Sequence, residues 1–208
     1  MIALETERLR LRRCTEADVQ ALFEMLSDED VVRFLPFERI RTRRYAERVL
    51  DEKFLDRYRR ADAGEGPQYG VPLDARWAVE ERDSGSFIGF VTVGCNEAHD
   101  VGYALRRESW GRGCAREALR AVFSWARACG LGFLTATHDV DNPRSGAVME
   151  ACGMTARYIY REQWLPKKPI VTFCMHQVDF VPEVAEYQGY WNRWPDHWRA
   201  QGCSRRQP

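Results

Sequence analysis

The sequence lacks a charge excess of either sign. Its 208 residues contain 31 lysines and arginines against 31 aspartates and glutamates, so the formal net charge is zero. Proteins that bind nucleic acid or an anionic membrane surface generally carry a basic excess. We therefore expect no nucleic-acid partner and no membrane partner.

Long apolar runs are also missing. No stretch is long enough for a transmembrane helix, and the opening "MIALETERLRLRR" lacks the apolar segment of a secretory signal. These two absences predict a soluble protein that resides in the cytoplasm.

The cysteines lack the spacing of a disulfide framework or a zinc site. There are seven, an odd number, and no two form a C-x-x-C pair. We therefore expect reduced thiols and no bound metal. The seven are Cys14, Cys95, Cys114, Cys129, Cys152, Cys174 and Cys203.

Hydrophobic periodicity is present and predicts alternating strands and helices without an internal repeat. Strands are expected where apolar residues alternate or cluster, over residues 4–15, 76–81, 86–96, 101–107, 133–140, 157–164 and 170–178. Helices are expected over residues 15–26, 41–60, 113–130 and 142–153, and a loop rich in glycine and proline over residues 61–75. This order predicts one mixed α/β domain over residues 1–180.

Residues 181–208 break this pattern and predict a C-terminal extension rich in aromatic residues. Five large rings follow one another at helical spacing, so one face of a short helix can hold them, with Pro195 bending or restarting it. Such a face must be covered by the domain itself or by a partner subunit, or it forms a lid over the acceptor cleft, where the rings stack on a substrate. Monomer and homodimer both remain open. The rings are Tyr187, Tyr190, Trp191, Trp194 and Trp198.

The stretch "ESWGRGCAREAL", residues 108–119, places two glycines directly before a predicted helix. Gly111 and Gly113 allow close approach of the backbone, and the start of a helix presents unpaired N–H groups and a positive dipole end. This combination predicts a cradle for an anion, most often a phosphate. A plain glycine turn into a helix is the simpler alternative.

Three motifs in this order resemble the GNAT superfamily of N-acetyltransferases. "WGRGCA" (Trp110 to Ala115) resembles the family's Q/R-x-x-G-x-G/A phosphate motif except at its first position. "LETERLRLR" (Leu4 to Arg12), and Asn142 to Ser145 followed by Gly153-Met154, are similar to patterns of the RimJ/RimL ribosomal-protein acetyltransferase branch. The resemblance covers about residues 2–178.

The resemblance implies that acetyl-CoA lies between two splayed parallel strands, here residues 101–107 and 133–140, of a mostly antiparallel sheet of six to seven strands. Main-chain N–H groups of the glycine loop would hold the pyrophosphate and Asn142 the pantetheine arm. Arg116 either adds a phosphate contact or points into solvent. The residues expected to bind the cofactor are Leu105, Arg106, Trp110, Gly111, Arg112, Gly113, Cys114, Ala115, Arg116, Asn142 and Ser145.

The implied activity is transfer of acetyl from acetyl-CoA to a primary amine, by direct attack in a ternary complex. Met149 stands where many relatives have a tyrosine acid, so the resemblance assigns the general acid to Ser145. A backbone N–H near Ala104 or Leu105 would stabilise the oxyanion. Glu162 and Asp100 are both candidates for the base, although each is more often an ordinary surface carboxylate. His99 and His138 are further, weaker candidates.

The acceptor amine is expected between the first two helices and the closing strand pair. Phe34, Phe37, Trp164 and the loop at residues 61–75 would line it, with Phe34 equally suited to the core. A protein N-terminus and a small-molecule amine remain open as acceptors. A GNAT-shaped module that binds CoA without catalysis is the alternative function; a P-loop is disfavoured because no Lys-Ser/Thr follows the glycines.

Overall fold

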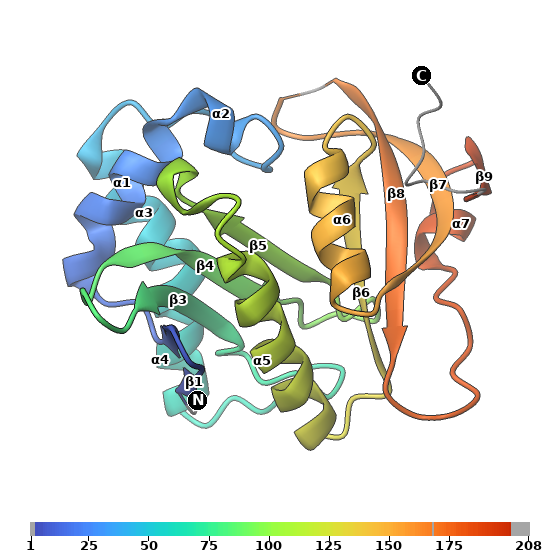
Figure 1. Cartoon of the computed structure of the whole chain (residues 1–208), viewed down its shortest axis with the longest axis horizontal. Helices are drawn as coiled ribbons and strands as arrows, with labels where there is room; N and C mark the ends of the chain where they lie inside the picture. The colour runs from blue at the N-terminus through green and yellow to red at the C-terminus, as the bar shows by residue number, and fades with distance from the viewer. Residues whose placement is uncertain (1–2, 168, 201–208) are drawn as a thin grey trace.

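The structure, a computed structural model, describes residues 3–167 and 169–200 and contains two sheets with helices around them (Figure 1). The first sheet has the order β1-β2-β3-β4-β5 and the second the order β6-β8-β7-β9. The strands are β1 (Leu4–Glu5), β2 (Leu9–Arg12), β3 (Arg76–Glu81), β4 (Phe87–Val93), β5 (Val101–Leu105), β6 (Phe133–Asp139), β7 (Thr155–Gln163), β8 (Ile170–Asp179) and β9 (His197–Arg199).

The single strand expected over residues 4–15 is wrong, because a turn divides it into the antiparallel pair β1 and β2. The hydroxyl of Thr6 closes this turn: Thr6 Oγ1 donates to Leu9 O at 3.1 Å and accepts from Leu9 N at 2.9 Å. Apolar alternation continues on both sides of the turn, so periodicity alone does not reveal it.

Helices of the N-terminal half cover one face of the first sheet. They are η1 (Glu16–Asp18), α1 (Val19–Ser27), α2 (Glu29–Val32), α3 (Arg43–Leu50), the π-helical η2 (Asp51–Leu55) and α4 (Asp56–Asp62). The helix expected over residues 41–60 is therefore present, with a π-helical turn inside it. Phe54 packs edge-on against Phe90 of β4, with ring centroids 5.5 Å apart, and so attaches this layer to the sheet.

The opposite face of the first sheet is covered by α5 (Cys114–Ala128), which begins after the short η3 (Arg107–Ser109). Leu119 and Val122 of α5 are fully buried in the same core as Trp77 of β3. The Trp77 and Trp125 rings meet edge-on at 4.8 Å. This packing holds the N-terminus of α5 beside the end of β5.

The two sheets touch where β5 and β6 approach each other, and then diverge (Figure 1). A single parallel bridge joins Asp100 to Thr135, and Thr135 Oγ1 donates to Ala98 O at 2.8 Å. The splayed parallel pair expected from the resemblance is thus confirmed. The expected single sheet of six to seven strands is instead two sheets, of five and four strands. The number of strands is higher than expected because β1 and β9 add short strands at the outer edges.

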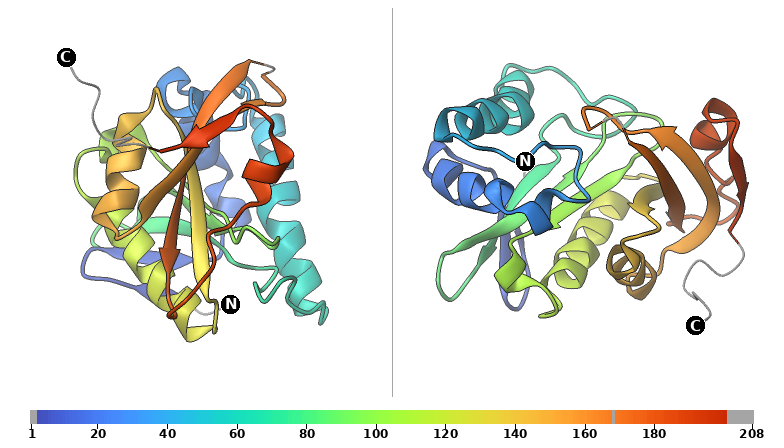
Figure 2. Two further views of the ribbon diagram at one scale, coloured as in Figure 1. Left: turned by 90° about the vertical axis from the view of Figure 1, so that its right-hand side faces the viewer. Right: turned by 90° about the horizontal axis from the view of Figure 1, so that it is seen from above.

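The second sheet carries α6 (Pro143–Ala151) on one face and the aromatic extension on the other (Figure 2). Helix α7 (Gly189–Arg193) packs on β7, and β9 pairs antiparallel with β7. Residues 181–200 thus lie against the domain's own sheet, which is the first of the three expected arrangements. Tyr190 stacks on Tyr160 at 5.1 Å, with the rings 5° apart.

A single helical face for all five rings is wrong. Trp194 is extended at the end of α7, ahead of Pro195, and Trp198 belongs to β9, where it is 38% exposed. Cys203 lies outside the described residues. Within the described residues, no helix has the length and apolar character needed to cross a bilayer.

Candidate active site

A cleft of about 2170 Å³ runs through the opening between β5 and β6 and collects most of the predicted site residues. Of these, the cleft is lined by Phe34, Phe37, Asp100, Leu105, Trp110, Gly111, Arg112, Gly113, Cys114, Ala115, Arg116, Asn142, Ser145, Glu162 and Trp164. Arg106 does not line it: its guanidinium pairs with Glu24 at 2.9 Å. The prediction of Arg106 as a cofactor contact therefore finds no support in this geometry.

The glycine loop has the backbone conformation that only glycine adopts without strain. Gly111 and Gly113 have φ angles of 73° and 81°, in the left-handed region. Arg8 donates from its guanidinium to Arg112 O at 2.9 Å, which fixes this carbonyl. The first intrahelical bond of α5 runs from Glu117 N to Gly113 O, so the N–H groups before Glu117 remain available to a ligand.

Two guanidinium groups flank the loop. A Cβ built on Gly113 would lie 3.4 Å from Arg8 Nη2 and 3.7 Å from Arg116 Nη2. Free helical N–H groups, a dipole end and two cations form a suitable receptor for a pyrophosphate. Arg116 lies beside the loop, as a contact between its side chain and a phosphate requires. Arg8 was missed, because its contact with the loop spans more than 100 residues of sequence.

The main chain of Leu105 faces the cleft. Arg106 N donates to Ile88 O of β4, and successive amides along a strand point to opposite edges, so Leu105 N–H points away from β4. Its carbonyl shares this direction and accepts from Trp110 Nε1 at 2.9 Å. Trp110 therefore ties the loop to β5, and Leu105 N–H is directed away from β4, toward the cleft that Leu105 lines.

Ser145, on the first turn of α6, forms a hydrogen bond with Tyr103 of β5. The two hydroxyl oxygens are 2.8 Å apart, and Tyr103 Oη also lies 3.1 Å from Ser145 O. Burial raises the pKa of Tyr103 to about 12, so its hydroxyl stays protonated at neutral pH. Tyr103 was missed by sequence reasoning. Met149 is buried in the core, which agrees with its lack of a catalytic role.

Asn142 precedes α6 at the capping position, yet its side chain makes no capping hydrogen bond. The helix begins instead with Pro143, whose fixed φ suits a first helical turn. Asn142 is therefore the N-cap of α6 by position, but its side chain does not cap the helix. Its amide lines the cleft and is available to a ligand.

Asp100, just before β5, and Glu162 of β7 both line the cleft, and the charge of Glu162 acts on Asp100. Burial, together with the neighbouring charge of Glu162, raises the pKa of Asp100 to about 7, and a hydrogen bond from Thr135 opposes this shift. Burial also raises the pKa of Glu162, while Arg193 of α7 opposes this shift. A carboxylate that titrates near neutral pH at the floor of a cleft is suited to proton transfer.

Comparison with known proteins agrees with this geometry. A family model described as the acetyltransferase (GNAT) domain matches residues 8–155. The chain belongs to this family. It is accordingly an acetyltransferase. The glycine loop with Gly111 and Gly113, β5 and α6 all lie within the matched region.

Individual relatives extend the likeness. The chain is 28% identical over 166 residues to the uncharacterized N-acetyltransferase YoaA of Bacillus subtilis, covering 76% of this chain and 86% of YoaA. A GNAT-family acetyltransferase of Bacillus anthracis is 19% identical, with a TM-score of 0.69 over 86% of this chain and 99% of its own. A Vibrio cholerae spermidine N-acetyltransferase, solved with CoA and spermine, is 15% identical, with a TM-score of 0.64 over 84% and 96%. The two structures show a shared fold.

The far wall of the GNAT cleft is aromatic. Phe34 and Phe37 follow α2, and Trp164 follows β7. Tyr190 of α7 adds a ring to the cleft lining, as the lid arrangement of the extension requires. Lys167, in the turn between β7 and β8, donates to Arg33 O at 3.1 Å and so joins this turn to the segment after α2. None of the loop residues 61–75 lines the cleft, so the expected contribution of that loop is not found.

Proposed function

We propose that this GNAT domain transfers the acetyl group of acetyl-CoA directly to a primary amine bound in the same cleft. One observation carries the proposal: a single cleft unites an anion-binding glycine loop, the Tyr103–Ser145 pair and the Asp100–Glu162 pair. These groups supply cosubstrate binding, an acid and a base. A module that only binds CoA has no use for a carboxylate poised near pH 7.

The first step is removal of a proton from the acceptor. A primary amine enters mostly as an ammonium ion, which cannot attack a carbonyl. Asp100, ionised above about pH 7, accepts one proton, directly or through a water molecule, and leaves the nitrogen lone pair free. Glu162 keeps the pKa of Asp100 high enough for this transfer at neutral pH.

The second step is attack and collapse. The amine nitrogen bonds to the thioester carbon, and the oxygen that becomes negative accepts a hydrogen bond from Leu105 N–H. The carbon–sulfur bond then breaks, and Ser145 donates its proton to the leaving thiolate. The second proton of the amine nitrogen, released as the amide forms, replaces it on Ser145 Oγ, so that the serine hydroxyl is restored. Tyr103 stays protonated and can donate to Ser145 Oγ, which frees the serine proton for sulfur.

The acceptor would be recognised through its charge and through apolar contact. Two carboxylates attract the ammonium, and the faces of Tyr190, Trp164 and Phe34 provide surfaces on which a cationic amine packs favourably. The Vibrio cholerae neighbour, a spermidine N-acetyltransferase solved with spermine, is consistent with this amine class. The cleft suits a protein N-terminus or a small amine as the acceptor. The proposal is compatible with membership of the RimJ/RimL branch, and with either a monomer or a homodimer.

An acceptor screen tests the proposal. Full-length protein is mixed with acetyl-CoA and panels of polyamines, amino acids, aminoglycosides and N-terminal peptides, and thiol release is followed over time. We expect amine-dependent release with at least one class, and mass spectrometry should find one acetyl group on the amine nitrogen. Tight CoA binding without release for any class would favour the non-catalytic module.

A further inference from the structure

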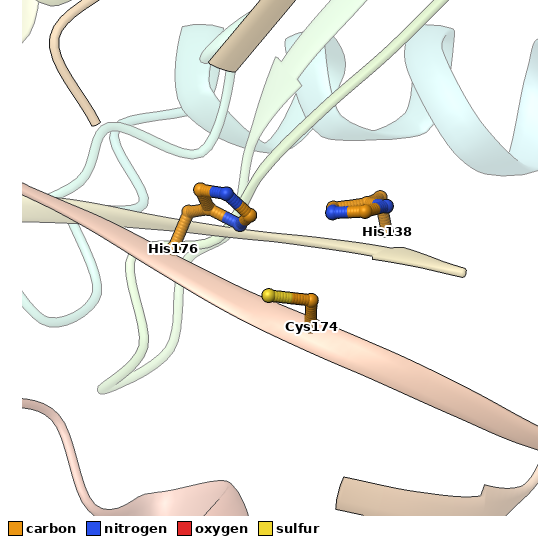
Figure 3. Close-up of side chains that lie close together, drawn as sticks. All are labelled: His138, Cys174 and His176. Carbon is orange, nitrogen blue, oxygen red and sulfur yellow. The ribbon is translucent and has the colours of Figure 1, made fainter. Parts of the chain in front are cut away.

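Three buried side chains outside the proposed reaction converge beneath α6 (Figure 3). They are His138 of β6 with Cys174 and His176 of β8. One nitrogen or sulfur atom of each lies within 4.8 Å of the other two. In Figure 3 the two imidazole rings lie beside each other, and the sulfur of Cys174 lies below the gap between them.

The sheet register brings these residues together. Strands β6 and β8 are antiparallel, and His138 is directly opposite Cys174. Residues two apart on a strand share a face, so His176 follows Cys174 on the side that α6 covers. On α6, a Cβ at Gly146 would lie 2.6 Å from His138 Nε2, so the helix can approach this closely only because position 146 has no side chain.

His176 is the observation that points to a ligand. Its exposure is 0%, and within the described residues neither ring nitrogen has a hydrogen-bond partner. A neutral imidazole carries one donor and one acceptor, and leaving both unpaired in a protein interior is costly. Coordination of one nitrogen to a cation removes this cost. Glu150 Oε1 lies 3.8 Å from His176 Nε2. Small movements would let Glu150 accept a hydrogen bond from Nε2 while Nδ1 coordinates the cation.

His138 is already oriented for coordination. Its Nδ1 lies 2.8 Å from the Asp139 carbonyl, which can only accept, so Nδ1 carries the hydrogen. The neutral ring then has its lone pair on Nε2. A backbone carbonyl that fixes the tautomer in this way commonly accompanies histidine ligands of metals.

We propose that His138, Cys174 and His176 bind one zinc ion, with water as the fourth ligand. Two imidazoles and one thiolate suit zinc and other borderline-soft transition metals, whereas magnesium and calcium require oxygen ligands. Bond lengths of about 2.0–2.3 Å place the ligand atoms of a tetrahedral zinc site roughly 3.4–3.7 Å apart. Side-chain adjustments of about 1 Å close the observed set to this geometry. The thiolate and Glu150 balance the charge of the cation.

The site would act on structure. Zinc would join β6 to β8 directly, and Glu150 would link α6 to the site through His176. Helix α6 begins beside Asn142 and carries Ser145. The expectation of no metal rested on cysteine spacing. Cys174-x-His176 on one strand face, completed by a histidine of a neighbouring strand, is a different ligand pattern. This proposal does not depend on the proposed reaction.

The test measures zinc binding by the full-length chain. Protein stripped with a chelator is titrated with zinc against a chromophoric competitor, and its melting temperature is recorded with and without zinc. We expect one zinc per chain and a higher melting temperature. Cys174→Ser and His176→Gln should each weaken binding by more than about 100-fold, because even an outer partner contributes about 10–100-fold. Cys14→Ser, at a buried thiol in another core, is the matched control and should bind as the wild type.

Two further measurements keep the test decisive if a buried variant fails to fold. Cobalt bound to the wild-type protein should show a thiolate-to-metal charge-transfer band. Glu150→Gln, at an exposed position, should weaken zinc binding by about 10-fold or more while the protein stays folded. A wild-type protein that binds no zinc, a cobalt complex without the thiolate band, or unchanged affinity in folded Cys174→Ser or His176→Gln would each overturn the proposal.

Discussion

The two sides of the cleft bind their ligands by different means. On the cofactor side, β5, the glycine loop and α5 present main-chain N–H groups, and arginines such as Arg8 and Arg116 support them. On the acceptor side, β7, the turn after it and α7 present side chains, namely Glu162, Trp164 and Tyr190. One side would recognise a phosphate through the backbone, and the other would recognise an amine through charge and aromatic surface.

This difference explains what the family match reveals. The match ends at residue 155, before β7 is complete and before α7 and β9 begin. A backbone cradle needs glycine at two positions and a helix start, so it leaves a readable local motif. An acceptor wall of side chains can change with the substrate. The family therefore identifies acetyl transfer, while part of the proposed acceptor wall, including Trp164 and Tyr190, lies outside the match.

The largest effect is expected from Asp100→Asn, which removes the base proposed for the acceptor amine. Loss of the base should lower kcat/KM by about 10²–10⁴-fold while leaving CoA affinity unchanged. In the wild type, kcat/KM should rise with pH through an inflection near 7, where Asp100 ionises, and the variant should lose this inflection. Steady-state kinetics from pH 5.5 to 8.5, with calorimetric CoA binding, measure both. Weaker CoA binding would show that Asp100 belongs to the cofactor side.

Glu162→Gln identifies which carboxylate is the base. If Asp100 is the base, removing the Glu162 charge should move the inflection below pH 7, because that charge helps raise the Asp100 pKa. Disappearance of the inflection would instead assign the base to Glu162.

The same Asp100→Asn variant should be more stable than the wild type at pH 8. The folded-state pKa is raised from 3.8 to about 7, so the wild type loses stability as pH rises between these values. At about 1.4 kcal/mol per unit, the shift limits this loss to a few kcal/mol, and partial exposure reduces it. The melting temperatures of the two proteins should converge near pH 4. A variant that is less stable at pH 8 would contradict the raised pKa.

The second effect concerns the acid at the boundary of the two sides. Ser145→Ala should lower kcat by about 10²-fold with little change in the acetyl-CoA KM, since proton donation acts only in the transition state. Tyr103→Phe should lower kcat less, because it removes only the partner of Ser145. Ser124→Ala, at a serine on α5 that bonds within its own helix, is the control. Wild-type turnover in Ser145→Ala would assign thiolate protonation to water or to another group.

The third effect belongs to the cofactor side. Gly113→Val should weaken CoA binding by roughly 10–100-fold, because a β-branched residue at φ 81° costs about 1–3 kcal/mol and its side chain points between two guanidiniums. Gly130→Val is matched in strain, at φ 80°, but lies just beyond the far end of α5. It should destabilise the fold without changing CoA affinity. Equal CoA affinities in the two folded variants would show that the main-chain N–H groups around Gly113 do not bind CoA.

The smallest effect should come from one ring of the acceptor wall. Phe34→Ala should raise the acceptor KM by roughly 3–10-fold and leave the acetyl-CoA KM unchanged, since a half-buried ring contributes about 1 kcal/mol of contact. Phe23→Ala truncates a partly buried ring that does not line the cleft and is the control. A change in the acetyl-CoA KM alone would place Phe34 on the cofactor side.

Local features were predictable from the sequence because they are encoded by neighbouring residues. The left-handed turn at Gly111 and Gly113, the start of α5 and the order of strands and helices all follow from propensity, periodicity and helix-end chemistry. The expectation that β5 and β6 splay came from the family resemblance of these motifs. Errors arose where one side chain interrupts a regular pattern, as Thr6 does between β1 and β2.

Tertiary structure alone decided which distant groups meet. Tyr103 reaches Ser145, Arg8 reaches the glycine loop, and His138 meets Cys174 and His176, each across a long sequence separation. It also decided that Asp100 lies in surroundings that raise its pKa, whereas the sequence shows only an aspartate. Periodicity reports which face of an element is apolar, but contacts and burial depend on how strands register and how layers pack. The sequence by itself therefore determined the cosubstrate cradle, and packing determined the proton-transfer groups and the acceptor wall.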